Sequence, residues 1–123
     1  METNHLGCFA EYLFCAECTK KGFTVSMPIL DSSIYDCLVD TGDKIFKVQI
    51  KSSQKTPINN ENTVNIYIDN PKREYTKDKV HYFAVYSSFY EGFFVFPNLG
   101  NMKAFRASKS GKNNVWFNNF NFV

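Results

Sequence analysis

The sequence contains no long apolar run, and its first residues do not lead us to expect a signal peptide. No stretch approaches the roughly 20 apolar residues that a membrane-spanning helix needs. The first residues, Met1-Glu2-Thr3-Asn4-His5, include no Lys or Arg, whereas a secretory signal begins with a basic segment. We therefore expect a cytoplasmic protein without a membrane partner.

Cysteine and histidine are also scarce, with four residues of the first and two of the second. Cys15 and Cys18 have the spacing of a metal-binding or redox pair, but they fall inside a predicted helix. There is no second such pair and no His-x-x-x-His, and a zinc site needs four well-placed ligands. We instead expect three of the cysteines to border the core as small apolar side chains.

The chain lacks the strong positive charge that marks many nucleic-acid-binding proteins. Its formal net charge is +2, which is compatible with a nucleic-acid partner without indicating one. Locally, residues 103–123 include four basic side chains and no acidic one. This segment is either a solvated surface or a phosphate contact, and both readings remain open.

The chain does have enough apolar material for a core. It is 123 residues long, 44% of them are hydrophobic, and 13 are phenylalanine. Disorder would require the opposite composition. No internal repeat or domain boundary is visible, so we expect one globular domain over residues 1–123.

Periodicity predicts one helix followed by a mixed sheet. Apolar residues recur at helical spacing over 3–21, with Thr3 or Asn4 as the expected N-cap and Gly22 as the stop. Apolar runs predict strands at 23–27, 34–40, 44–51, 63–68, 80–86, 93–96 and 103–107. Residues 52–63 are expected to be a polar loop, and 71–79 irregular or a short helix. The order indicates an α/β or α+β fold with the helix covering one sheet face.

Polar residues gather where the strand at 44–51 ends. Strand alternation places Gln49, Lys51 and Ser53 on one face. Asp36 lies on the strand at 34–40, which the short turn at 41–43 joins to that strand as a hairpin. Glu11 lies one helical turn after Gly7, which leaves the helix surface uncrowded, so it can approach the same place.

This set suits phosphodiester hydrolysis. A magnesium ion bound by carboxylate, amide and backbone oxygens neutralises phosphate charge and activates water. Asp36, the Gln49 side-chain oxygen and the Ile50 carbonyl form a reasonable ligand set, with Glu11 as a further ligand. Lys51 would stabilise transition-state charge or hold the attacking water.

Four short motifs, taken in their order along the chain, resemble those of a known protein family. They are Gly7-x-x-x-Glu11, Gly22-Phe23-x-Val25, Tyr35-Asp36-x-Leu38-Val39 and Val48-Gln49-Ile50-Lys51. Together they resemble the PD-(D/E)XK nuclease superfamily, and most closely its group I intron-associated homing endonucleases, in which glutamine replaces one acid. The interval from Glu11 to Gly22 is also similar to that in archaeal Holliday junction resolvases.

The second half of the chain resembles the same group more loosely. The run from Val80 to Tyr86 followed by Phe94-Val95-Phe96-Pro97 is similar to the strand pair after its active site, and Lys112-Asn113 is similar to its C-terminal Lys-Asn. His81 is a departure, because an aspartate is expected there.

The resemblance implies a restriction-endonuclease-like core, with a mixed central β-sheet flanked by helices. It implies catalytic roles for Glu11, Asp36, Gln49 and Lys51, and Mg²⁺ as cofactor with Mn²⁺ as a substitute. The expected activity is DNA endonuclease cleavage by a homodimer or higher homo-oligomer, because two strands need two sites. Resolution of branched DNA is one alternative. A catalytically inactive module of the same fold, binding nucleic acid or protein, is another.

Simpler interpretations stand beside the site residues. Gln49 fits a half-buried strand position and Lys51 an exposed edge lysine that discourages aggregation. Glu17 is an alternative to Glu11 as the acid from the helix, because its position around the helix axis is nearer the apolar stripe. The residues proposed to contact nucleic acid are Ser53, Lys55, Lys72, Arg73, Lys112 and Asn113.

Overall fold

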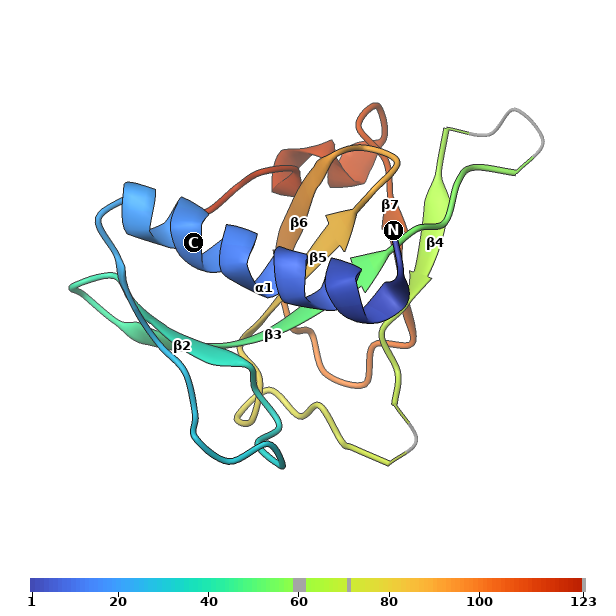
Figure 1. The fold of residues 1–123 in the computed structure, drawn as a ribbon. Helices are drawn as coiled ribbons and strands as arrows, with labels where there is room; N and C mark the ends of the chain where they lie inside the picture. The colour runs from blue at the N-terminus through green and yellow to red at the C-terminus, as the bar shows by residue number, and fades with distance from the viewer. Residues whose placement is uncertain (59–61, 71, 123) are drawn as a thin grey trace.

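The computed structural model describes residues 1–58, 62–70 and 72–122. One α-helix, seven strands and a short 3-10 helix are found in this part of the chain (Figure 1). Their bounds are α1 Thr3–Lys20, β1 Thr24–Ser26, β2 Cys37–Asp40, β3 Ile45–Ser53, β4 Val64–Tyr67, β5 Tyr82–Ser87, β6 Gly92–Pro97, β7 Ala104–Ala107 and η1 Lys112–Trp116.

The central sheet is mixed and has the order β1-β2-β3-β5-β6. The pairs β1–β2, β2–β3 and β5–β6 are antiparallel, and β3–β5 is parallel, with Gln49 opposite Phe83 and Lys51 opposite Val85. The predicted hairpin is present and consists of β2 and β3. The fold class predicted from the sequence is confirmed.

Helix α1 covers one face of this sheet, as predicted. Its buried positions recur every fourth residue, and they are Leu6, Ala10, Phe14 and Cys18. These side chains pack on Val48, Ile50, Ala84, Phe93 and other residues of the sheet. The helix direction therefore places its first turns beside the later half of β3.

The C-terminal end of α1 is where the sequence predicted it, but the N-cap residue is a different one. Gly22 follows the C-cap Lys21 with a φ of 89°, the left-handed conformation that favours glycine. The predicted N-cap was wrong. Glu2, in extended conformation, is the cap, because its carboxylate accepts the Asn4 N–H at 2.9 Å and leaves Thr3 inside the helix.

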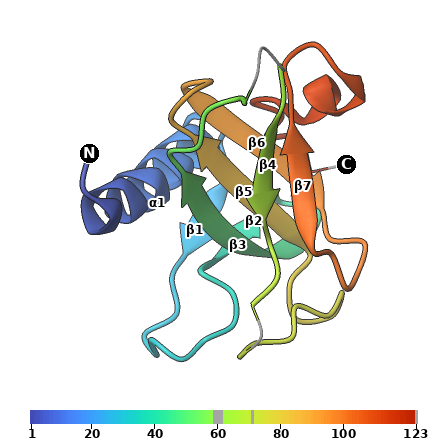
Figure 2. The same cartoon turned by 90° about the vertical axis from the view of Figure 1, so that its right-hand side faces the viewer.

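The opposite face of the sheet is covered by a second sheet. Strands β4 and β7 pair antiparallel and lie in front of the central sheet in Figure 2. Their inward residues Val64, Ile66 and Phe105 form a second core with Phe83, Phe94 and Phe96 of the central sheet. The sequence predicted both strands, but it did not predict that they would pair and cover this face.

Of two predicted loop segments, 52–63 begins later than expected, and the described part of 71–79 is irregular, one of its two predicted forms. β3 continues through Ser53 because its parallel pairing with β5 extends to Ser53 opposite Ser87. Lys79 and Val80 both donate backbone N–H groups to the Thr76 carbonyl, so residues 72–79 contain a turn and no α-helix. The parts of these loops at 59–61 and at residue 71 lie outside the described residues.

The described cysteines are all thiols. Cys18 and Cys37 are buried in the core under α1, so two of the three expected cysteines belong to it, while Cys15 is half-buried and Cys8 is exposed. None of the described helices is long and apolar enough to cross a membrane.

Candidate active site

The later half of β3, the residue before β2 and the first turns of α1 surround one polar pocket of about 390 Å³. In Figure 1 these turns of α1 lie across the end of β3. The pocket brings together all the catalytic residues expected from the sequence, namely Glu11, Asp36, Gln49 and Lys51, with Ile50. The other lining residues are Thr3, Asn4, Gly7, Cys8 and Ser52.

Asp36 is held by the backbone of β3. Its own N–H donates to the Val48 carbonyl at 2.9 Å, and its Oδ2 accepts the Ile50 N–H at 2.7 Å. Burial raises the pKa of Asp36, while the Ile50 N–H and then the charges of Lys51 and Arg73 oppose the rise. The carboxylate is thus fixed in position and only partly compensated in charge.

Glu11 approaches Asp36 from the helix. Burial raises the pKa of Glu11, and the Asp36 charge raises it further. Two carboxylates in one partly buried pocket repel each other unless a cation lies between them. Glu17, the competing acid, lines a different pocket near Lys20 and Lys21, so the geometry favours Glu11.

Gln49 is the residue whose surroundings are least complete. Its side chain is only 9% exposed, and its Oε1 has no hydrogen-bond partner among the described residues. A buried amide oxygen without a partner loses its hydration and gains no bond in return. The oxygen is therefore available to a ligand that enters the pocket.

Basic and aromatic side chains adjoin the two acids. The Lys51 Nζ lies 5.1 Å from the centre of the Tyr75 ring, a cation–π distance. Arg73 donates from Nη1 to the Ser33 carbonyl at 2.8 Å, and its charge acts on Asp36. Sequence reasoning chose Arg73 on charge alone and missed Tyr75, since no local pattern indicates that this ring meets β3.

The donor set fits a divalent cation that prefers oxygen ligands. Two carboxylates and an unpartnered amide oxygen line one small pocket, and such oxygens are the ligands of Mg²⁺ and Mn²⁺. No group of three or more His, Cys, Asp or Glu side chains is arranged to hold a metal ion within residues 1–58, 62–70 and 72–122. A cation here would therefore depend on Gln49 as well as on Asp36 and Glu11.

A family model decides the class of protein. The model for the PD-(D/E)XK endonuclease matches residues 1–112, which is most of the chain. The chain belongs to the PD-(D/E)XK endonuclease family. The resemblance seen in the motifs is thereby confirmed.

Two solved structures of such nucleases share the fold. A bacterial homing endonuclease, I-Ssp6803I, has a TM-score of 0.77 at 19% identity, covering 95% of this chain and 87% of that one. The Holliday junction resolvase Hjc of the hyperthermophilic archaeon Archaeoglobus fulgidus has a TM-score of 0.55 at 16% identity, covering 85% and 84%. No curated protein matches the chain.

The other residues proposed to contact nucleic acid fall into separate places. Ser53 is buried, and its Oγ accepts the Lys55 N–H at 3.2 Å, which is a structural role. Lys55 lies just beyond β3, with its Nζ 4.5 Å from the centre of the Tyr67 ring. Lys72 is exposed, and its N–H donates to Asn70 Oδ1 at 3.0 Å.

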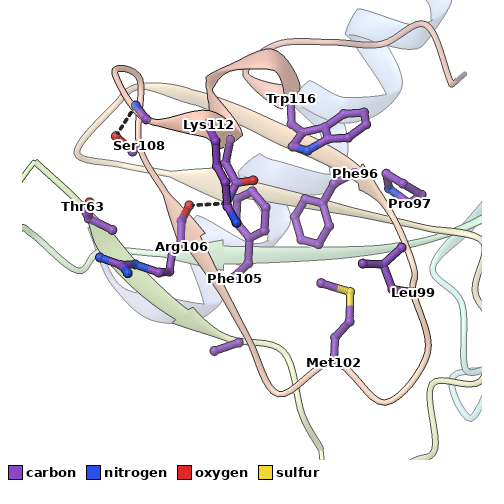
Figure 3. A pocket seen from close by; sticks show the side chains of 13 residues that line it. Thr63, Phe96, Pro97, Leu99, Met102, Phe105, Arg106, Ser108, Lys112 and Trp116 are labelled. Atoms are coloured by element: carbon purple, nitrogen blue, oxygen red, sulfur yellow. Dashed lines mark hydrogen bonds between the residues drawn. The ribbon is translucent and has the colours of Figure 1, made fainter.

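Lys112 and Asn113 lie at a second pocket, outside the one that contains Asp36. This pocket has a volume of about 580 Å³ and is lined mainly by apolar side chains, including Phe96, Phe105 and Trp116 (Figure 3). Asn113 Nδ2 donates to the Arg106 carbonyl at 3.0 Å, which ties η1 to β7. The structure therefore does not bring these two residues to the candidate active site.

Proposed function

We propose that this PD-(D/E)XK family member is a divalent-cation-dependent endonuclease that hydrolyses phosphodiester bonds of DNA. The observation that carries the proposal is the unpartnered Gln49 Oε1, buried in the pocket that holds Asp36 and Glu11. Cation-binding sites and phosphate-cleaving sites are where buried acids and unsatisfied oxygens are expected to collect.

Within this proposal Asp36, the Gln49 amide oxygen and the Ile50 carbonyl hold Mg²⁺, or Mn²⁺ in its place, with Glu11 as a further ligand. The Ile50 N–H fixes Asp36, so the backbone of one residue, Ile50, would both orient a ligand and supply one. When bound, the cation would neutralise the scissile phosphate and make water a stronger nucleophile.

Lys51 has a different role in the proposal. Its ammonium group is close enough to oppose the rise in the pKa of Asp36, so it adjoins the place where a phosphate would bind. The Tyr75 ring limits where the lysine can point. We assign Lys51 to the negative charge that develops on the phosphate during attack.

Gln49 makes the site less negative than one with a third carboxylate. Affinity for hard divalent cations follows the number of charged ligands, so this site should bind Mg²⁺ weakly in the absence of DNA. A phosphate oxygen from DNA would complete the ligand set. Binding of cation and of DNA should therefore strengthen each other.

Duplex DNA is the substrate that we put first, and a four-way junction is the second. The first follows the homing endonuclease and the second the junction resolvase whose folds this chain shares. Cleavage of both strands requires two copies of the site, so we propose a homodimer or a higher homo-oligomer as the acting form.

The test is nicking of a supercoiled plasmid by the purified protein with Mg²⁺, with Mn²⁺ and with EDTA. We expect cleavage with either ion, none with EDTA, and loss of cleavage by Asp36→Ala. Asp43→Ala, in the exposed turn after β2, is the matched control and should cleave like wild type. A duplex and a junction of the same sequence separate the two substrates. Equal rates for wild type and Asp36→Ala would refute the proposal.

A further inference from the structure

The outward side of strands β4 and β7 is a polar surface that the active-site pocket does not include. Side chains alternate along both strands, so Asn65 and Tyr67 of β4 and Ala104 and Arg106 of β7 are exposed, while their neighbours are buried. Asn65 lies directly opposite Arg106, and Tyr67 opposite Ala104. We call these four residues the ribbon face.

The ribbon face is positively charged. None of its four residues is acidic, Arg106 is basic, and Lys55, which contacts Asn65 and Tyr67, adds a second positive charge. The Lys55 Nζ donates to the Asn65 carbonyl at 3.3 Å and lies over the Tyr67 ring. The nearby Asp69 is paired with Lys103 at 3.1 Å, so it does not cancel this charge. The surface is thus suited to a polyanion.

Lys55 also connects the ribbon face to the candidate active site. It lies four residues after Lys51 on the same stretch of chain, and four residues of extended chain span at most about 14 Å. Figure 2 shows β4 and β7 facing the viewer, with the end of β3 and the start of α1 to one side. A DNA molecule is wide enough to contact both regions at once.

We propose that the ribbon face lies in the major groove of the DNA substrate and reads its base sequence, which rests on the function proposed above. Arg106 and Asn65 contact base edges, and Lys55 contacts the phosphate backbone at the side nearer the active site. The exposed ring of Tyr67, opposite the small Ala104, packs against the groove wall.

Shape and chemistry both favour this occupant. The major groove, about 12 Å wide, admits a two-stranded β-ribbon, whereas the minor groove, about 6 Å wide, does not. Arginine pairs with guanine and asparagine with adenine through two hydrogen bonds each, and both bases present those edges in the major groove. One residue of each kind stands side by side on the ribbon face.

The experiment is cleavage of a randomised duplex library in Mg²⁺, followed by sequencing of the cleaved molecules. Wild type, Asn65→Ala, Arg106→Ala and Lys55→Ala are compared with Lys44→Ala. Lys44 is exposed in the turn before β3, at the other end of that strand, so its substitution removes one charge away from the ribbon face.

We expect Arg106→Ala and Asn65→Ala each to lose discrimination at one or two base pairs, by roughly tenfold to a hundredfold. Lys55→Ala should weaken cleavage of all sequences alike and reduce the salt dependence by about one phosphate contact. Lys44→Ala should match wild type. The variants change exposed side chains, so melting temperatures should stay near that of wild type.

Other results overturn the inference in distinguishable ways. Unchanged base preferences in Arg106→Ala and Asn65→Ala, or a wild type without any preference, refute base reading by the ribbon face but leave the nuclease intact. Absence of metal-dependent cleavage by wild type refutes the proposed function, and this inference with it.

Discussion

The earlier and later parts of β3, which we call its two ends, differ in whether their polar groups have hydrogen-bond partners. Near its start, the Lys47 N–H donates to His81 Nδ1 at 2.9 Å, the Lys47 carbonyl accepts the His81 N–H at 2.8 Å, and the Lys47 Nζ donates to the Asp78 carbonyl at 3.0 Å. In the later part, which begins at Gln49, the Gln49 Oε1 has no partner in the described chain, and Asp36 and Glu11 raise the electrostatic energy of the pocket.

This difference shows how a candidate binding site can be recognised within one strand, by the polar groups that have no partner. The first end is a completed hydrogen-bond network that stabilises the fold by itself. The second end leaves the Gln49 amide oxygen without a partner among the described residues and the charge of Asp36 only partly compensated by Lys51 and Arg73. Unsatisfied groups cost stability, so a fold that keeps them at one place has a use for them there.

The largest expected effect comes from two lysines of the same strand. Lys51→Ala should reduce metal-dependent nicking by about 100-fold or more, as loss of one transition-state donor does in other enzymes. Lys47→Ala, at the completed end, should remain within about twofold of wild type. Initial nicking rates on one plasmid measure both. Equal losses in the two variants would remove the distinction between the ends.

His81→Ala tests the completed end through stability. It leaves the partly buried Lys47 N–H without its acceptor, so we expect a loss of about 1–3 kcal/mol in the free energy of unfolding. Nicking per folded molecule should stay unchanged. Urea denaturation and nicking at a temperature where both proteins are folded give the two readouts. A stable variant with lost activity would place His81 in the site instead.

Gln49→Glu tests the incomplete end through cation affinity. A third carboxylate should strengthen Mg²⁺ binding, on the order of tenfold, because affinity follows ligand charge. In EDTA the same variant should melt at a lower temperature than wild type, since three acids then share one pocket. Calorimetric titration and thermal melting measure the pair of effects. Unchanged affinity would mean that position 49 does not touch the cation.

The smallest effect is a pH dependence in EDTA. The pKa values of Asp36 and Glu11 are raised above the ordinary 3.8 and 4.5. Raised carboxyl pKa values favour the folded state at low pH, and this contribution is lost as pH rises through them. Glu11→Gln should therefore raise the melting temperature relative to wild type more at pH 7 than at pH 4. An equal rise in melting temperature at the two pH values would contradict this expectation.

Much of the site could be predicted because it is encoded locally. Alternation along β3 and the short turn at 41–43 predicted the hairpin that brings Asp36 to Gln49 and Lys51. The interval from Glu11 to Gly22, through its resemblance to that in junction resolvases, favoured the acid that lines the pocket over Glu17, although helical phase favoured Glu17. Each of these signals is a spacing between residues near one another in the chain.

The rest depends on contacts between distant segments. The parallel pairing of β3 with β5 joins residues more than thirty positions apart, and no periodicity within either strand indicates it. The same holds for β4 with β7 and for the approach of Tyr75 to Lys51. For the same reason charge alone could not separate Arg73, beside Asp36, from Lys112 at the second pocket.

The central claim is that the incomplete end of β3 binds a divalent cation through Gln49. Crystals of the protein soaked with Mn²⁺ and measured for anomalous scattering test this directly. We expect one anomalous peak within bonding distance of the Asp36 carboxylate and Gln49 Oε1, which disappears in Gln49→Leu crystals. A pocket without a peak, or a peak that persists in Gln49→Leu, would contradict it.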